Sequence, residues 1–242
     1  MPRKKKEKEE VVGEITNKIV NWYEKIPEEL LDKTSNPNYS LHHLKIPMRG
    51  LIVAPSGGYK SNLICNLLYL FGAGEGTFST IHLLCKDASE PLYKFLQMKC
   101  PRILIKEGLQ HIPDMNKMDK SENHLVIFDD FCLEKNQMPI ESFYQRCRKR
   151  NCSVLYLSQS YYMTPIFIRK NLNYLFILKL NGLRDIKSIL SENGLGVTND
   201  QLLKMYQYCV ATPMTPLIVD FAEQPEKRFR KGFDEILNPE LY

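Results

Sequence analysis

The stretch "RGLIVAPSGGYKSNLICNLLYLF", residues 49–71, limits the fold of this chain more than any other. An apolar run at 49–55 enters a glycine-rich bend, and a run with the length and spacing of a helix, 60–71, leaves it. A strand that passes through a tight loop directly into a helix is the building unit of α/β proteins. The stretch therefore predicts a strand, a loop and a helix of an α/β fold.

The rest of the chain repeats this alternation. The apolar runs predict further strands and helices, without the clean two-residue alternation of a half-exposed strand. Such strands are typical of a parallel sheet that helices cover on both faces. The strands are expected at 79–86, 102–108, 124–131, 152–159 and 173–180, with an edge strand at 216–221, and the helices at 89–99 (capped by Ser89), 139–150 and 164–171. The expected fold is an open, mainly parallel central sheet flanked by helices.

Composition excludes several classes of protein. The 242 residues are 43% hydrophobic and 25% charged, which is ordinary for a soluble globular domain. No apolar run reaches the roughly 20 residues of a membrane-spanning helix, and the start of the chain lacks a signal-peptide core. The seven cysteines are scattered and complete no zinc pattern, so free thiols in a reducing compartment are expected.

Charged segments and breaks in the helical pattern predict the domain organisation. Residues 1–12 are basic and contain too few apolar residues to fold alone, which favours a flexible tail, either a solvated end or an arm that contacts DNA or directs nuclear import. A helical lead-in is expected at 13–44. The α/β domain is expected at 45–242, with its core at 45–180 and a helical C-terminal extension at 181–242.

The loop between the first strand and helix nearly matches a phosphate-binding loop: Gly, four residues, Gly, Lys, then Ser or Thr. Lys60 and Ser61 match, as a lysine for the outer phosphates and a hydroxyl for magnesium. Ala54 and Tyr59 replace the two fixed glycines. The residues expected to bind nucleotide are Pro55, Ser56, Gly57, Gly58, Tyr59, Lys60, Ser61 and Asn62.

Tyr59 is the more serious of the two departures. If its position requires a positive φ, a bulky residue there costs about 1–2 kcal/mol. Its ring could also cover a base or contact a neighbouring subunit. The alternative is an ordinary Gly-Gly turn with an exposed lysine.

Two later strand ends supply the polar groups that nucleotide hydrolysis requires. "HLVIFDD" ends in Asp129, a candidate magnesium ligand, and Asp130, a candidate for activating the attacking water. "SVLYLSQ" ends in Gln159, which in the neighbouring strand could sense the γ-phosphate or that water. The alternative for the two acids is a strand end that caps the start of a helix.

Basic residues lie between these two strand ends, at 144–151. Arginine stabilises the charge on a transferring phosphoryl group, often from a neighbouring subunit. Arg146, Arg148 and Arg150 alternate, so a helix would spread them over different faces, and one finger plus surface or DNA contacts is expected. Arg169 is a further candidate for sensing or subunit contact. The alternative is a solvated basic helix end.

In this order the motifs resemble the FtsK–HerA branch of P-loop ATPases, and more narrowly the poxvirus-type DNA-packaging ATPases of viruses, virophages and Maverick-type elements. The resemblance rests on "LIVAPSGGYKSNLI", "HLVIFDDF" and "FYQRCRKRNCSVLYLSQSYYMTPIFIRKNLNYLFIL", and it covers about 45–180.

The resemblance implies a RecA-like P-loop NTPase that forms a ring and packages double-stranded DNA into a capsid, with ATP and Mg²⁺ as cofactors. It implies Lys60 as the phosphate lysine, Ser61 and Asp129 as magnesium ligands, and Asp130 and Gln159 as catalytic acid and sensor. Arg148 matches the arginine finger, with Arg146 in reserve. The implied partners are DNA, copies of the chain and capsid proteins, with no membrane, in a virus factory, the nucleus or the virion.

Two other functions stay open on the residues alone. A nucleotide or small-molecule kinase uses the same loop, although no lid sequence distinct from the core is visible. A non-hydrolysing scaffold that binds ATP or DNA would follow if Tyr59 disables the site.

Overall fold

The computed structural model describes residues 19–30, 35–182 and 184–242. The chain divides into two compact units, Met1–Asp32 and Lys33–Tyr242. The described residues of the first unit form two 3₁₀ turns, η1 (Trp22–Lys25) and η2 (Glu28–Leu30), in place of a continuous helix. Pro27, between them, explains the interruption. The expected basic tail, 1–12, lies outside the described residues.

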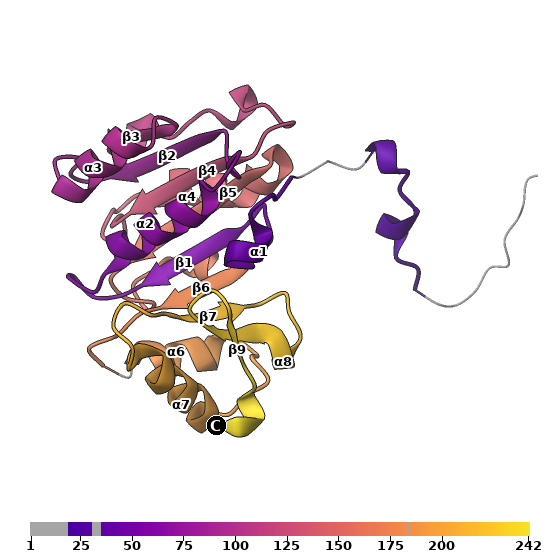
Figure 1. Ribbon diagram of the computed structural model, residues 1–242, viewed down its shortest axis with the longest axis vertical. Coiled ribbons are helices and arrows are strands. Elements are labelled where there is room, and N and C mark those ends of the chain that lie inside the picture. Colours follow the sequence, from indigo (N-terminus) through magenta and orange to yellow (C-terminus); the bar gives the residue numbers. More distant parts are fainter. Residues whose placement is uncertain (1–18, 31–34, 183) are drawn as a thin grey trace, which may run out of the picture. The chain divides into compact units, whose positions relative to one another are not determined.

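The second unit carries the sheet. Its described residues contribute nine strands in the order β3-β2-β4-β5-β1-β6-β7-β8-β9 (Figure 1). The six on one side are mutually parallel, which confirms the expected fold class. They are β1 (Arg49–Val53), β2 (Thr80–Cys85), β3 (Ile103–Glu107), β4 (His124–Asp129), β5 (Cys152–Ser158) and β6 (Tyr174–Ile177).

Helices cover both faces of the sheet, as parallel strands require. The helices are α1 (Tyr39–His42), α2 (Lys60–Phe71), α3 (Pro91–Lys99), α4 (Met138–Arg146), α5 (Ile166–Arg169), α6 (Arg184–Glu192), α7 (Asn199–Val210) and α8 (Pro225–Arg228). Short 3₁₀ turns are η3 (Leu109–His111), η4 (Met115–Lys117), η5 (Cys147–Arg150) and η6 (Pro239–Leu241). No helix in the described ranges is long and apolar enough to cross a membrane.

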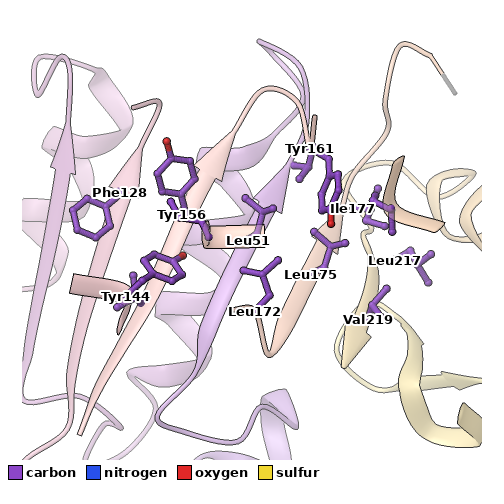
Figure 2. Close-up of a cluster of buried hydrophobic side chains, with 14 of the residues drawn as sticks. Leu51, Phe128, Tyr144, Tyr156, Tyr161, Leu172, Leu175, Ile177, Leu217 and Val219 are labelled. Carbon is purple, nitrogen blue, oxygen red and sulfur yellow. The ribbon is translucent and has the colours of Figure 1, made fainter. Parts of the chain in front are cut away.

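The core consists of two hydrophobic clusters, and central strands such as β1 and β5 supply side chains to both of them in alternation. In β1, Leu51 packs with Tyr144 of α4 and Tyr156 of β5 in one cluster (Figure 2). Its neighbour Ile52 packs in the other cluster, with residues of α2 such as Leu67. All of these side chains are buried. The buried strands therefore read as continuous apolar runs because both of their faces are covered.

The start of α3 differs from the expectation. The residue before the helix is Glu90, and Pro91 takes the first helical position, so Ser89 is not the cap. The Ser89 backbone N–H instead donates to the Asp87 carboxylate at 2.8 Å. Proline favours the first helical position, where its missing N–H costs nothing, and this places the helix start after Ser89.

The C-terminal region also differs. The extension begins with α6 and α7, after which β7 (Leu217–Asp220), β8 (Phe229–Lys231) and β9 (Glu235–Leu237) continue the sheet antiparallel, with only the short helix α8 between β7 and β8. The prediction of an edge strand at 216–221 is therefore wrong: β7 is paired on both sides, and β9 forms the edge. Two strands of three residues each are too short for a sequence pattern to indicate.

Candidate active site

A cleft of about 380 Å³ lies at the carboxyl ends of the central parallel strands. β5 pairs with both β1 and β4, so the loops that leave these three strands converge on one edge of the sheet. The cleft is lined by Ser56, Gly57, Gly58, Tyr59, Lys60, Ser61, Asn62, Glu90, Leu92, Asp129, Asp130 and Gln159. Apart from Pro55 and the two arginines, every residue that we expected in the site lines it.

The loop after β1 follows a strained path. Tyr59 has φ 67° and ψ 20°, the left-handed conformation in which the sequence predicted a cost for a bulky residue. Position 58 has no room for a side chain, because a Cβ there would lie 2.8 Å from both the Ala54 Cβ and the Pro55 carbonyl oxygen. Ala54 is fully buried, and its N–H donates to the Ser158 carbonyl at 3.1 Å. This bond ties the loop to the end of β5.

Lys60 points back across the loop. Its Nζ donates to the Ala54 carbonyl at 2.8 Å and to the Pro55 carbonyl at 3.1 Å. Burial lowers the pKa of the Lys60 ammonium, and the charges of Asp129 and Asp130 oppose that decrease. The lysine thus lies between the loop and the two carboxylates, within the cleft that both line.

Asp129, the last residue of β4, is held by a residue that the sequence analysis missed. The hydroxyl of Tyr93, on α3, donates a short hydrogen bond to Asp129 Oδ2. Burial raises the pKa of Asp129, and this hydrogen bond opposes the rise. Burial likewise raises the pKa of the Tyr93 phenol. Of the expected pair of magnesium ligands, Asp129 is thus held by a buried phenol, and Ser61 lines the same cleft.

Asp130 and Gln159 contact each other directly. The Gln159 Nε2 donates to Asp130 Oδ1 at 2.9 Å and to Oδ2 at 3.0 Å. Asp130 has φ 62°, a conformation that aspartate tolerates better than most residues and that tends to occur at functional sites. The sequence predicted both side chains at one site but did not predict this hydrogen bond.

The two candidate finger residues are not in this cleft. Arg146 ends α4 and Arg148 lies in η5, so both precede β5, whereas Gln159 follows it. The seven residues of a strand span about 20 Å, which separates the arginines from the cleft within one chain. Arg148 is exposed, and its side chain has no hydrogen bond or ion pair to another described residue. Arg146 donates to the Asn116 side chain at 3.4 Å.

The other basic candidates fall into two groups. A second cleft, of about 430 Å³, is lined by Met115, Lys120, Gln145, Arg146, Lys149 and Arg150, and so is strongly basic. Arg169 is 6% exposed, pairs with Glu192 and stacks on the Tyr161 ring, 5.1 Å from its centroid. These contacts explain Arg169 as part of the packing of α5 against α6.

A family model described as Poxvirus A32 protein matches residues 93–216, which is 124 of 242 residues and just over half of the chain. The chain belongs to this family. The match includes Tyr93, both aspartates, Gln159 and both arginines, and it begins after the phosphate loop. The resemblance to poxvirus-type ATPases that the motifs indicated is thereby confirmed. No curated protein matches the chain.

Three solved structures show the same fold. Genome packaging NTPase B204 from Sulfolobus turreted icosahedral virus 2, in complex with ATP-gammaS, matches with a TM-score of 0.53 at 13% identity, covering 80% of this chain and 100% of that chain. The DNA-packaging ATPase B204 from Sulfolobus Turreted Icosahedral Virus matches with 0.55 at 11%, covering 78% and 98%. ATPases 2 and 3 of EssC from Geobacillus thermodenitrificans match with 0.52 at 10%, covering 80% and 40%. The fold is that of P-loop ATPases.

Proposed function

We propose that this chain is an ATP-hydrolysing motor that moves double-stranded DNA into a viral capsid. One observation carries the proposal: a single cleft, in a chain of this family, is lined by the phosphate loop, both aspartates and the glutamine. B204, whose fold the chain shares, is described as a genome packaging NTPase and has been crystallised with an ATP analogue.

The phosphate loop would hold the nucleotide. Lys60 already donates two hydrogen bonds to carbonyl oxygens, and phosphate oxygens would replace these acceptors when ATP binds. The backbone of Tyr59 adopts the conformation that a glycine would take, so the tyrosine does not change the path of the loop. This disfavours the scaffold alternative, in which Tyr59 disables the site.

The Ser61 hydroxyl and the Asp129 carboxylate fit a magnesium ion. Both are hard oxygen donors, both line the cleft, and the Asp129 carboxylate is held by Tyr93. Magnesium in nucleotide sites takes few protein ligands, with phosphate oxygens and water completing its shell. When bound, the ion would neutralise charge on the phosphates.

Asp130 and Gln159 would act on the attacking water. Asp130 can accept its proton, and the Gln159 amide, which donates to both carboxylate oxygens, fixes the orientation of that carboxylate. The arrangement fits attack by water better than phosphorylation of a substrate, which disfavours the kinase alternative.

The arginines would act on other molecules. Because about 20 Å of β5 separates Arg148 from the cleft of its own chain, an arginine finger here would serve the cleft of a neighbouring subunit, which implies a ring. DNA contacts would be made to phosphates irrespective of sequence and would weaken with salt. Capsid proteins would be docking partners, in a virus factory, the nucleus or the virion of an infected cell.

ATP hydrolysis measured with and without double-stranded DNA tests the proposal. The expected result is phosphate release that rises with DNA and that falls by at least about a hundredfold in Lys60→Ala, because the lysine contacts the transferring phosphate. Lys204→Ala is the matched control, since Lys204 pairs with Asp200 on α7. Phosphate transfer to an added nucleoside, with no release to water, would contradict the motor and support a kinase.

A further inference from the structure

Tyr93 belongs to a part of α3 that reaches the cleft. Pro91 begins the helix, and Glu90 and Leu92, on either side of it, line the cleft. Tyr93, one residue further, is 1% exposed, and its hydroxyl reaches Asp129 Oδ2. The start of α3 thus places a buried phenol behind the aspartate.

The hydrogen bond of this phenol occupies only one side of the aspartate. The Tyr93 hydroxyl donates to Asp129 Oδ2. Among the described residues no hydrogen bond reaches the other oxygen of Asp129, Oδ1. Asp129 therefore keeps the lone pairs of Oδ1 available to a cation in the cleft.

On the basis of the proposed function, we propose that Tyr93 is a positioning residue for the magnesium site, which orients the Asp129 carboxylate. Outer-shell hydrogen bonds of this kind fix the geometry of metal ligands, and their loss typically lowers metal affinity about 10–100-fold. Tyr93 itself does not contact the nucleotide or the ion.

Tyr144 shows what a phenol with a structural role does in the same domain. It is fully buried, and its hydroxyl donates to the Gly50 backbone carbonyl at 2.9 Å, inside the core. The Tyr93 hydroxyl donates instead to a carboxylate that lines the cleft. Packing alone would not require this hydroxyl, because phenylalanine fills nearly the same space.

The test compares Tyr93→Phe with the wild-type chain in three measurements. The Mg²⁺ concentration for half-maximal ATP hydrolysis should rise at least about tenfold, while kcat at saturating Mg²⁺ stays within about threefold. Binding of Mn²⁺ in the presence of ATP, followed by electron paramagnetic resonance, should weaken by a similar factor. Binding of a fluorescent ATP analogue in EDTA should not change.

Tyr144→Phe is the matched control, expected to lower the melting temperature and leave Mn²⁺ affinity unchanged. If Tyr93→Phe binds Mn²⁺ as tightly as the wild type, the inference is wrong while the motor still stands. If it binds Mn²⁺ more tightly, the phenol competes with the cation, which also overturns the inference. A wild-type chain that binds no nucleotide would instead contradict the proposed function.

Discussion

The carboxyl ends and the amino ends of the parallel strands, called here the carboxyl edge and the amino edge of the sheet, differ in whether their charged groups already have partners. At the carboxyl edge, Lys60 donates to its own loop, Gln159 to Asp130, and Tyr93 to Asp129. At the amino edge, the basic side chains around η5 have few partners. Lys120, Arg148, Lys149 and Arg150 form no side-chain hydrogen bond or ion pair to another described residue.

This difference indicates that the two edges have different roles. At the carboxyl edge, the side chains proposed to contact the phosphates, the ion and the water are oriented by hydrogen bonds within the chain, which reduces the reorganisation required during the reaction. Basic side chains without partners are not oriented in advance in this way, but they are available to bind an anion on another molecule. We therefore expect changes at the carboxyl edge to act within one subunit and changes at the amino edge to act between subunits.

The largest expected effect comes from mixing two inactive variants. Asp130→Asn removes the proposed proton acceptor and Arg148→Ala removes the proposed arginine finger, so each alone should lose at least about a hundredfold in hydrolysis. In a 1:1 mixture, some interfaces combine an intact Asp130 with the neighbour's intact Arg148. With random assembly, about a quarter of the wild-type rate should return.

Arg146→Ala, mixed with Asp130→Asn in the same way, shows which arginine is the finger. If the Arg148 mixture stays inactive while each variant still assembles with wild-type chains, the finger does not act between subunits. That outcome would break the division between the two edges.

A smaller effect, on stability, is expected from His42 on α1 at the amino edge. The side chain is fully buried, its Nδ1 accepts the Leu44 N–H at 3.0 Å, and its Nε2 has no partner among the described residues. Burial lowers its pKa from 6.5 to about 4, with the nearby charges of His43 and Arg230 acting in the same direction. The folded chain therefore keeps His42 neutral where the unfolded chain binds a proton.

The direction of the pH dependence of stability follows from this difference in pKa between the folded and unfolded states. Above pH 6.5 neither state binds the proton and the full stability is present; as the pH falls from 6.5 towards 4, only the unfolded state gains it. His42 should cost the folded state about 2–3 kcal/mol over that interval. Urea unfolding at several pH values should show a shallower decline in His42→Phe. An unchanged slope would show that His42 does not couple folding to pH.

Much of this arrangement could be predicted from the sequence, because each parallel strand ends where its apolar run ends. That rule placed Asp129 and Gln159 at one edge with the phosphate loop. The same rule implies that the two arginines lie at the opposite edge, because Arg146 and Arg148 precede β5 while Gln159 follows it. The wrong predictions concern Ser89 and the C-terminal strands, where a proline and very short strands decide the structure.

Two features of the site could not be predicted in this way. The hydrogen bond between Gln159 and Asp130 depends on the register of β4 against β5, in which Asp129 lies opposite Leu157. Tyr93 was missed because an aromatic residue at an apolar position of a helix reads as core. Its burial is indeed that of a core residue, and only the direction of its hydroxyl reveals the second role.

The smallest expected effect measures the strain at the carboxyl edge. Tyr59, at φ 67°, should cost the folded state about 1–2 kcal/mol. Tyr59→Gly should recover only part of this energy, because glycine loses more conformational freedom on folding than tyrosine does. We expect a net gain of about 1 kcal/mol in urea unfolding. ATP binding should persist, because the backbone already has the glycine-like conformation.

Tyr69→Gly gives the opposite sign and serves as the control. Tyr69 is 81% exposed on α2, the helix that Tyr59 precedes, where replacing tyrosine by glycine should destabilise by about 0.5 kcal/mol. If Tyr59→Gly also destabilises, the tyrosine ring makes contacts that outweigh its backbone strain. Because that ring is 52% exposed within the described chain, such contacts would have to come from nucleotide or a neighbouring subunit, and the carboxyl edge would then also act between subunits.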